Sequence, residues 1–270
     1  MNFRTIVDIP RPNFLIEPLE EMLFVGSCFA DNMGKRFAEE RFPVVVNPFG
    51  VMYNPVSVRH TIERWTAQRV EKGGVVPRIV VVTLGTNHVY WLKETGQVVD
   101  NCRKMPQQLF REEELTAEAC VEELSKAVTL LCRHRVDVQV MVTVSPIRYA
   151  KYGYHASQLS KAVLLLTADK LCRRHDNVTY FPAYEIVMDE LRDYRFYQPD
   201  MLHPSAQAVE FIWEQLTETY LSARAKQFLR DWKPVKEALQ HRPFHLESDD
   251  YQRFLAQTKQ READVLRAYI

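Results

Sequence analysis

Apolar runs alternate with amphipathic segments along most of the chain. Short runs rich in apolar and β-branched residues predict strands, because such residues suit the buried surface of a sheet. These runs lie within 20–26, 42–51, 77–86, 136–146 and the first part of 177–191. Apolar residues about one turn apart predict helices between them. The helical segments are 30–42, 57–69, 111–135, 157–176 and 203–222, with a short helix at the end of 177–191.

This alternation predicts the fold class. Strands that alternate with helices usually build one mainly parallel sheet with helices on both faces. The run at 77–86 is rich in β-branched residues, which is typical of a strand buried on both faces. The strongest helix is expected at 111–135, where an acidic start and a basic end suit the helix dipole. We therefore expect an α/β sandwich, although the order of its strands does not follow from the pattern.

The pattern changes near residue 224. The remaining segment is highly charged and mostly helical in spacing, and Pro234 and Pro243 interrupt it. We predict an α/β domain over 1–225 and a helical extension over 226–270. The extension either packs on the domain or forms an oligomer contact, and the oligomeric state does not follow from the sequence.

Charge and hydropathy limit the partners and the cellular location that we expect for the protein. Lys+Arg and Asp+Glu both number 35, so the net charge of zero favours neither nucleic acid nor an anionic membrane as partner. No apolar run approaches the roughly 20 residues of a membrane span. The N-terminal segment 1–14 lacks the apolar region of a signal peptide. We expect a cytoplasmic protein.

The sequence gives no support for a metal or a cofactor. The five cysteines are odd in number and form no CxxC pair, which argues against a disulfide framework or a cysteine zinc cluster. The eight histidines are scattered, and HxH, HExxH, P-loop and GxGxxG motifs do not occur.

The first candidate site is Gly26-Ser27-Cys28, where a predicted strand ends and a helix begins. Active sites of open α/β sheets gather at the carboxyl ends of strands. A helix N-terminus there activates a thiol and offers N–H groups to an oxyanion. Either Ser27 or Cys28 can be the nucleophile. A turn with a helix cap and a buried cysteine would have the same local sequence.

The second candidate is Asp200-Met201-Leu202-His203, in a loop that enters a helix. The spacing allows the carboxylate to orient the imidazole and stabilise its protonated form, as in a nucleophile–His–Asp triad. The simpler alternative is a turn residue beside a helix cap.

Three loop residues are candidates for oxyanion or substrate binding. Gly50 follows the second predicted strand, and Asn87 and His88 follow the third, after Gly85. A glycine N–H or an amide side chain can donate to an oxyanion. Each is also an ordinary loop residue.

These motifs occur in the order found in the SGNH, or GDSL-like, hydrolases. That superfamily has GDS after the first strand, a loop glycine after the second, GxND after the third and DxxH before the last helix. Segment 26–30, "GSCFA", also resembles the signature of the GSCFA family, which is grouped with these hydrolases. The resemblance covers about residues 1–225. It extends to "SPIR" at 145–148 and to 180–205.

The resemblance implies a flavodoxin-like, three-layer α/β/α fold and hydrolysis or transfer of acyl esters. Aligned on the glycine, Cys28 takes the place of the superfamily's serine, and His88 replaces the aspartate of the third motif. Cys28 is therefore the first choice of nucleophile and Ser27 the second, because thiolates are strong nucleophiles. Arg148 is a further candidate for substrate contact.

Together the motifs and the resemblance imply an acyl-ester hydrolase acting on a small molecule or a glycan. Asp200 orients His203, which takes the proton of the nucleophile. The Cys28 N–H, Gly50 N–H and Asn87 amide hold the oxyanion. Three alternatives stay open: an acyltransferase on the same scaffold, a catalytically silent ligand-binding module, and a purely structural role.

Overall fold

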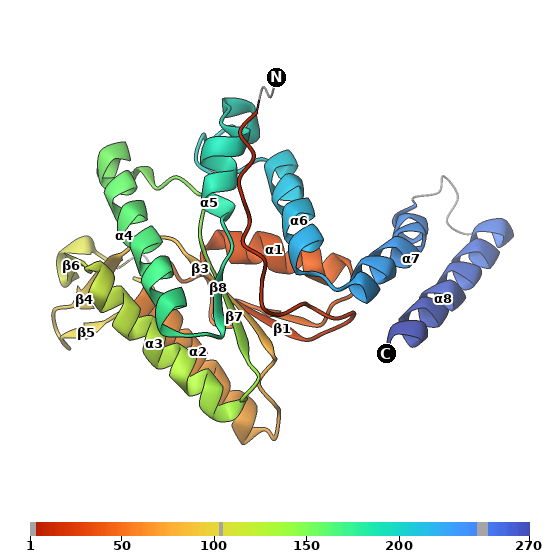
Figure 1. The fold of residues 1–270 in the computed structure, drawn as a ribbon, viewed down its shortest axis with the longest axis horizontal. Coiled ribbons are helices and arrows are strands. Elements are labelled where there is room, and N and C mark those ends of the chain that lie inside the picture. Colours follow the sequence, from red (N-terminus) through yellow and green to blue (C-terminus); the bar gives the residue numbers. More distant parts are fainter. Residues whose placement is uncertain (1–3, 103–104, 242–247) are drawn as a thin grey trace.

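The structure, a computed structural model, describes residues 4–102, 105–241 and 248–270. Five strands form one parallel sheet in the order β2-β1-β3-β7-β8 (Figure 1). Their bounds are β2 Val44–Val46, β1 Met22–Gly26, β3 Ile79–Leu84, β7 Gln139–Val144 and β8 Val178–Tyr180. Counted along the chain, this is the 2-1-3-4-5 order of flavodoxin-like sheets, whose ligands bind at the carboxyl ends of the first and third strands.

Helices cover both faces of this sheet (Figure 1). One face packs against α1 Cys28–Glu39, α5 Ala183–Glu185 and α6 Ala206–Tyr220. The short α5 continues as a π-helical segment, Ile186–Leu191. The other face packs against α2 Pro55–Glu71, α3 Ala117–His134 and α4 Gly153–Arg174.

Two hydrophobic cores result from the alternation of side chains along each strand. In β1, Met22 and Phe24 join the core under α1 and α6, whereas Leu23 and Val25 join the core under α2 and α3. All four side chains are fully buried, as expected of a central parallel strand.

A small antiparallel sheet follows β3 and was not expected from the sequence. It has the order β5-β4-β6, with β4 His88–Leu92, β5 Gln97–Val98 and β6 Phe110–Glu114. The prediction of a helix from residue 111 was wrong in its first turn. Residues 110–114 pair with β4, and the helix begins only after Thr116, whose side chain caps it by accepting from the Ala119 N–H.

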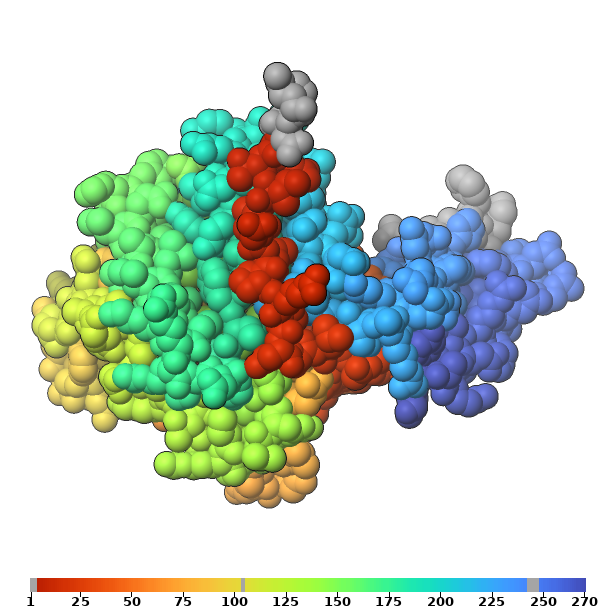
Figure 2. Space-filling model, viewed as in Figure 1, coloured from red at the N-terminus to blue at the C-terminus, as the bar shows by residue number. Residues whose placement is uncertain are grey.

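The C-terminal helices project from one end of the molecule (Figure 2). Helix α7, Ala223–Gln240, runs through Pro234, so the expected interruption there was wrong, while Pro243 lies outside the described residues. Phe228 and Trp232 of α7 are buried in the core that α1 and α6 share. Helix α8, Asp249–Tyr269, packs against α7.

The predicted fold class is confirmed, with three α/β/α layers, a parallel sheet and additional C-terminal helices. The domain boundary at 225/226 stays a prediction, and α7 crosses it. Among the described residues, no helix has the length and apolar character needed to cross a membrane.

Candidate active site

The turn after β1 brings the chain very close to β3. Gly26 has φ +140°, and a Cβ at this position would lie 2.1 Å from the Thr83 carbonyl oxygen. Only glycine allows this approach and this backbone conformation. The Gly26 N–H donates to the side chain of Asn47, at 2.8 Å, which ties the turn to the loop after β2.

Ser27 is the buried N-cap of α1. It is 1% exposed, and its Oγ accepts from the Phe29 N–H at 3.2 Å. The same Oγ lies 3.0 Å from Thr83 Oγ1, and the Ser27 N–H donates to Thr83 as well. The hydroxyl is therefore used in capping and in holding β1 to β3.

Cys28 is the first residue of α1 and is partly exposed. Its N–H has no acceptor inside the helix, because the first N–H groups of a helix lack intrahelical partners. Its Sγ lies 3.4 Å from the hydroxyl of Tyr53, in the loop after β2. The sequence did not single out Tyr53, since one tyrosine in a loop carries no recognisable spacing.

Asp200 and His203 form the expected pair. Asp200 Oδ2 lies 2.6 Å from His203 Nδ1, and Oδ1 accepts from the N–H groups of His203 and Leu202. Those two backbone N–H groups, followed by the imidazole, lower the pKa of Asp200 to about 2. The carboxylate thus holds the proton on Nδ1 and leaves Nε2 of His203 free to act as a base.

Arg148 fastens the loop that carries this pair. Its backbone N–H donates to the Leu202 carbonyl at 3.0 Å, and its guanidinium donates to the Met201 carbonyl at 3.1 Å. Because Arg148 follows β7, these bonds hold the loop at the carboxyl edge of the sheet. Arg148 was predicted to touch substrate, and that role stays a prediction.

Cys28 and His203 therefore belong to the same edge of the sheet, one after β1 and the other held beside the end of β7. The described residues give no hydrogen bond between Cys28 and His203. Catalytic hydrogen bonds often shorten only when substrate binds.

Two predicted oxyanion donors are engaged elsewhere. The Gly50 N–H donates to the Asn47 carbonyl at 2.8 Å within its own turn. The Asn87 side-chain NH₂ donates to the Leu115 carbonyl at 2.8 Å, and Asn87 is 2% exposed. Their role as oxyanion donors stays a prediction, and each would have to share or leave its present partner.

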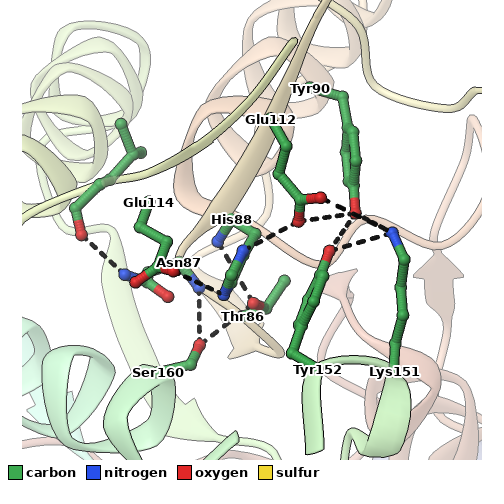
Figure 3. A network of polar contacts seen from close by, with 10 residues as sticks. Thr86, Asn87, His88, Tyr90, Glu112, Glu114, Lys151, Tyr152 and Ser160 are labelled. Atoms are coloured by element: carbon green, nitrogen blue, oxygen red, sulfur yellow. Dashed lines mark hydrogen bonds and ion pairs between the residues drawn. The ribbon is translucent and has the colours of Figure 1, made fainter. Parts of the chain in front are cut away.

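His88 belongs to a polar network on the small sheet (Figure 3). Its Nδ1 lies 2.9 Å from Glu112, and its ring stacks on Tyr152 at 4.1 Å between centroids. Tyr90 also donates to Glu112, at 2.9 Å, and Lys151 donates to the hydroxyls of Tyr90 and Tyr152. This network links β4 and β6 to the segment before α4.

Lys161 was not expected from the sequence. It lies on α4, is 3% exposed, and donates to the carbonyls of Gly85 at 2.9 Å and Ser145 at 2.8 Å. Burial lowers the pKa of its amine to about 7. Lys161 thus joins the chain just after β3 to the chain just after β7, the two positions that flank the candidate site.

A cavity of about 310 Å³ lies between the loop after β2 and the small sheet, and neither Cys28 nor His203 lines it. Tyr53 lines it together with His88, Tyr90, Tyr149 and Lys151. Its wall is therefore aromatic with a few polar groups, which is typical of sites for small organic ligands. Within the described parts of the chain, no cluster of three or more His, Cys, Asp or Glu side chains is placed to hold a metal ion.

Fold and site together define a flavodoxin-like α/β protein with a cysteine at its first strand–helix turn and an Asp–His pair just before α6. The chain belongs to the GSCFA family, whose model matches 21–78 and 76–216. A second model, the C-terminal domain of GSCFA domain proteins, matches 232–268. The family resemblance predicted from the motifs is confirmed.

Solved structures with similar folds include esterases. A carbohydrate esterase of family 3 from Talaromyces cellulolyticus is 10% identical, with 78% of this chain and 99% of that chain covered and a TM-score of 0.47. A family two carbohydrate esterase from Clostridium thermocellum, in complex with cellohexaose, is 13% identical, with 79% and 66% covered and a TM-score of 0.45.

A G-D-S-L family protein from Desulfitobacterium hafniense is 11% identical, with 74% and 99% covered and a TM-score of 0.41. Identities and TM-scores this low say nothing about the activity of the present chain. None of the curated proteins compared with the chain matches it.

Proposed function

We propose that the protein is an acyl-ester hydrolase that uses Cys28 as nucleophile, His203 as general base and Asp200 as the group that orients His203. One observation carries the choice of nucleophile. The hydroxyl of Ser27 is buried and engaged by Thr83 and Phe29, whereas the thiol of Cys28 is partly exposed at the start of α1.

The reaction follows from these roles. His203 Nε2 first takes the thiol proton. The thiolate Sγ then bonds to the ester carbonyl carbon, and the carbonyl oxygen becomes an oxyanion near the Cys28 N–H. The C–O bond then breaks, and His203 gives the proton to the leaving alcohol. Water attacks the resulting thioester with its proton passing to His203. The C–S bond then breaks, the carboxylic acid leaves, and His203 returns its proton to the sulfur, which restores the thiol.

The cavity beside Tyr53 supports a substrate of small size. Its aromatic wall and its volume of about 310 Å³ suit a small acylated molecule or one acylated sugar unit. An acylated glycan or small metabolite is therefore the proposed substrate class. The cytoplasmic location stays a prediction from the sequence.

The proposal is tested by activity and labelling. The purified protein is assayed with p-nitrophenyl acetate and with acetylated sugars, beside Cys28→Ala, His203→Ala and Ser27→Ala. We expect Cys28→Ala and His203→Ala to lose activity and Ser27→Ala to keep most of it. Iodoacetamide should modify Cys28, as read by peptide mass spectrometry.

Three outcomes would contradict the proposal. If a fluorophosphonate labels Ser27 and Cys28→Ala stays active, serine is the nucleophile. If residues 27 and 28 react with neither reagent and no ester is cleaved, the covalent mechanism is wrong. If an added sugar alcohol receives the acyl group in preference to water, the protein is a transferase.

A further inference from the structure

We infer that the hydroxyl of Tyr53 is a catalytic hydrogen-bond donor, to the Cys28 thiolate before acyl transfer and to the oxyanion during it. This inference rests on the proposed function and adds a residue that the sequence motifs do not contain. It starts from the 3.4 Å distance between Tyr53 Oη and Cys28 Sγ.

The direction of this hydrogen bond follows from chemistry. An ionised sulfur can only accept, so the phenol must donate once Cys28 has lost its proton. Burial, together with the contact to Cys28, raises the pKa of Tyr53 above its usual value. The phenol therefore keeps its proton at every pH where such an enzyme works.

The backbone of Tyr53 is held by two hydrogen bonds, although the residue is 41% exposed. Its carbonyl accepts from the N–H groups of Gly85 at 2.8 Å and Thr86 at 2.9 Å. Its ring packs on Gly85, where a Cβ would lie 3.0 Å from the ring. The next residue, Asn54, caps α2 by accepting from the Ser57 N–H at 2.9 Å. The glycine after β3 thus makes room for Tyr53, and the donor is preorganised.

Among the described residues, the two further oxyanion donors expected from the sequence already have other partners. The Gly50 N–H and the Asn87 amide already donate to Asn47 and Leu115. The Cys28 N–H, at the start of α1, supplies one donor. The oxyanion forms two bonds away from Sγ, so a hydroxyl that already contacts Sγ can turn to it. Cys28 N–H and Tyr53 hydroxyl then form a pair of donors.

Tyr53→Phe tests the inference because it keeps the ring on Gly85 and removes only the hydroxyl. With p-nitrophenyl acetate we expect kcat to fall by about 10²-fold with little change in KM, the typical loss of one oxyanion donor. Tyr251→Phe on α8 removes a phenol at the other end of the molecule and is the matched control, with kcat unchanged.

A second readout does not depend on turnover. An aliphatic trifluoromethyl ketone bonds to the thiolate and places its oxygen where the oxyanion forms, whereas iodoacetamide forms no oxyanion. Tyr53→Phe should weaken ketone inhibition by about 10²-fold and still allow iodoacetamide to modify Cys28. If wild type and Tyr53→Phe have equal ketone inhibition and equal kcat, the proposed role of Tyr53 is wrong, but the proposed function is not affected. Absence of both adducts in the wild type would overturn the proposed function, and this inference with it.

Discussion

At the scale of single residues, neighbouring side chains on the same turn have different tasks. Ser27 joins β1, β3 and α1, and Cys28 faces the loop with Tyr53. The sequence could predict that one of the two is a nucleophile, since strand, glycine and helix are visible in the pattern. It could not predict which one, because that depends on the distance from Ser27 to Thr83, a residue 56 positions away.

Ser27→Ala should therefore act on stability more than on chemistry. It removes the cap of α1 and leaves the buried Thr83 hydroxyl without this partner, which together cost about 1–3 kcal/mol. Urea unfolding of wild type and variant measures the difference, and iodoacetamide should still modify Cys28 in the folded variant. A variant as stable as wild type but without esterase activity would contradict this assignment.

Asp200 gives a prediction that depends on pH. Its pKa is lowered to about 2, below the value of about 3.9 for the unfolded chain. Its contribution to stability is therefore present above about pH 4 and is lost as the pH falls through about 2. Asp200 stays ionised throughout the working range, so Asp200→Asn should lower kcat by about 10³–10⁴-fold at every pH from 5 to 8.

The measurement is the pH–rate profile of both proteins with p-nitrophenyl acetate. Thermal unfolding at pH 6 shows whether the Asn variant is folded. A loss of less than tenfold in a folded variant would mean that Asp200 does not orient the base.

At the scale of elements, the carboxyl edge of the sheet depends on contacts that no local pattern reveals. The parallel strands were visible as apolar runs, but β4, β5 and β6 were not. The strand β6 is largely acidic and pairs Glu112 and Glu114 opposite Tyr90 and His88. Its charged side chains suit a helix start equally well, and only pairing with β4 decides between the two.

Lys161 offers a test of how this edge is held. A neutral amine has two N–H donors, which match its two acceptors, the carbonyls of Gly85 and Ser145. Its pKa is about 7 in the folded protein and about 10.4 in the unfolded chain. Between these values the unfolded state binds more protons, so stability from this group rises with pH.

Urea unfolding of wild type and Lys161→Met at pH 6.5 and pH 9 measures this effect. Between pH 6.5 and pH 9, the free energy of unfolding of wild type should rise by on the order of 2 kcal/mol relative to that of the variant. A difference that does not change with pH would mean that the amine stays charged in the folded protein throughout this range, as it does in the unfolded chain.

At the scale of the whole molecule, the C-terminal extension consists of two unlike parts. Helix α7 belongs to the core, because Phe228 and Trp232 are fully buried there. In α8, among the described residues, Thr258 is the one buried side chain, and Val265, Leu266 and Tyr269 are partly buried. Charge and proline pattern predicted an extension, but they could not show that its first helix is part of the domain.

Removal of the chain after residue 241 should separate these parts. Helix α8 is held by the Tyr269–Asp231 hydrogen bond of 2.6 Å, by the ring contact of Tyr269 with Phe228, and by an ion pair between Arg41 and Glu262. It lies at the opposite end of the molecule from β4, β5 and β6 (Figure 1). We expect esterase activity to be kept.

Loss of these contacts should lower Tm by about 3–8 °C, because each kcal/mol lost from the free energy of unfolding lowers Tm by about 2–4 °C in a chain of this size. Scanning calorimetry measures Tm, and size-exclusion chromatography at the same concentration shows whether α8 also joins copies of the chain.

Truncation after residue 221, which removes α7 as well, should give an unfolded protein because it takes Phe228 and Trp232 from the core. If truncation after residue 241 already abolishes folding or ester cleavage, α8 is an integral part of the domain.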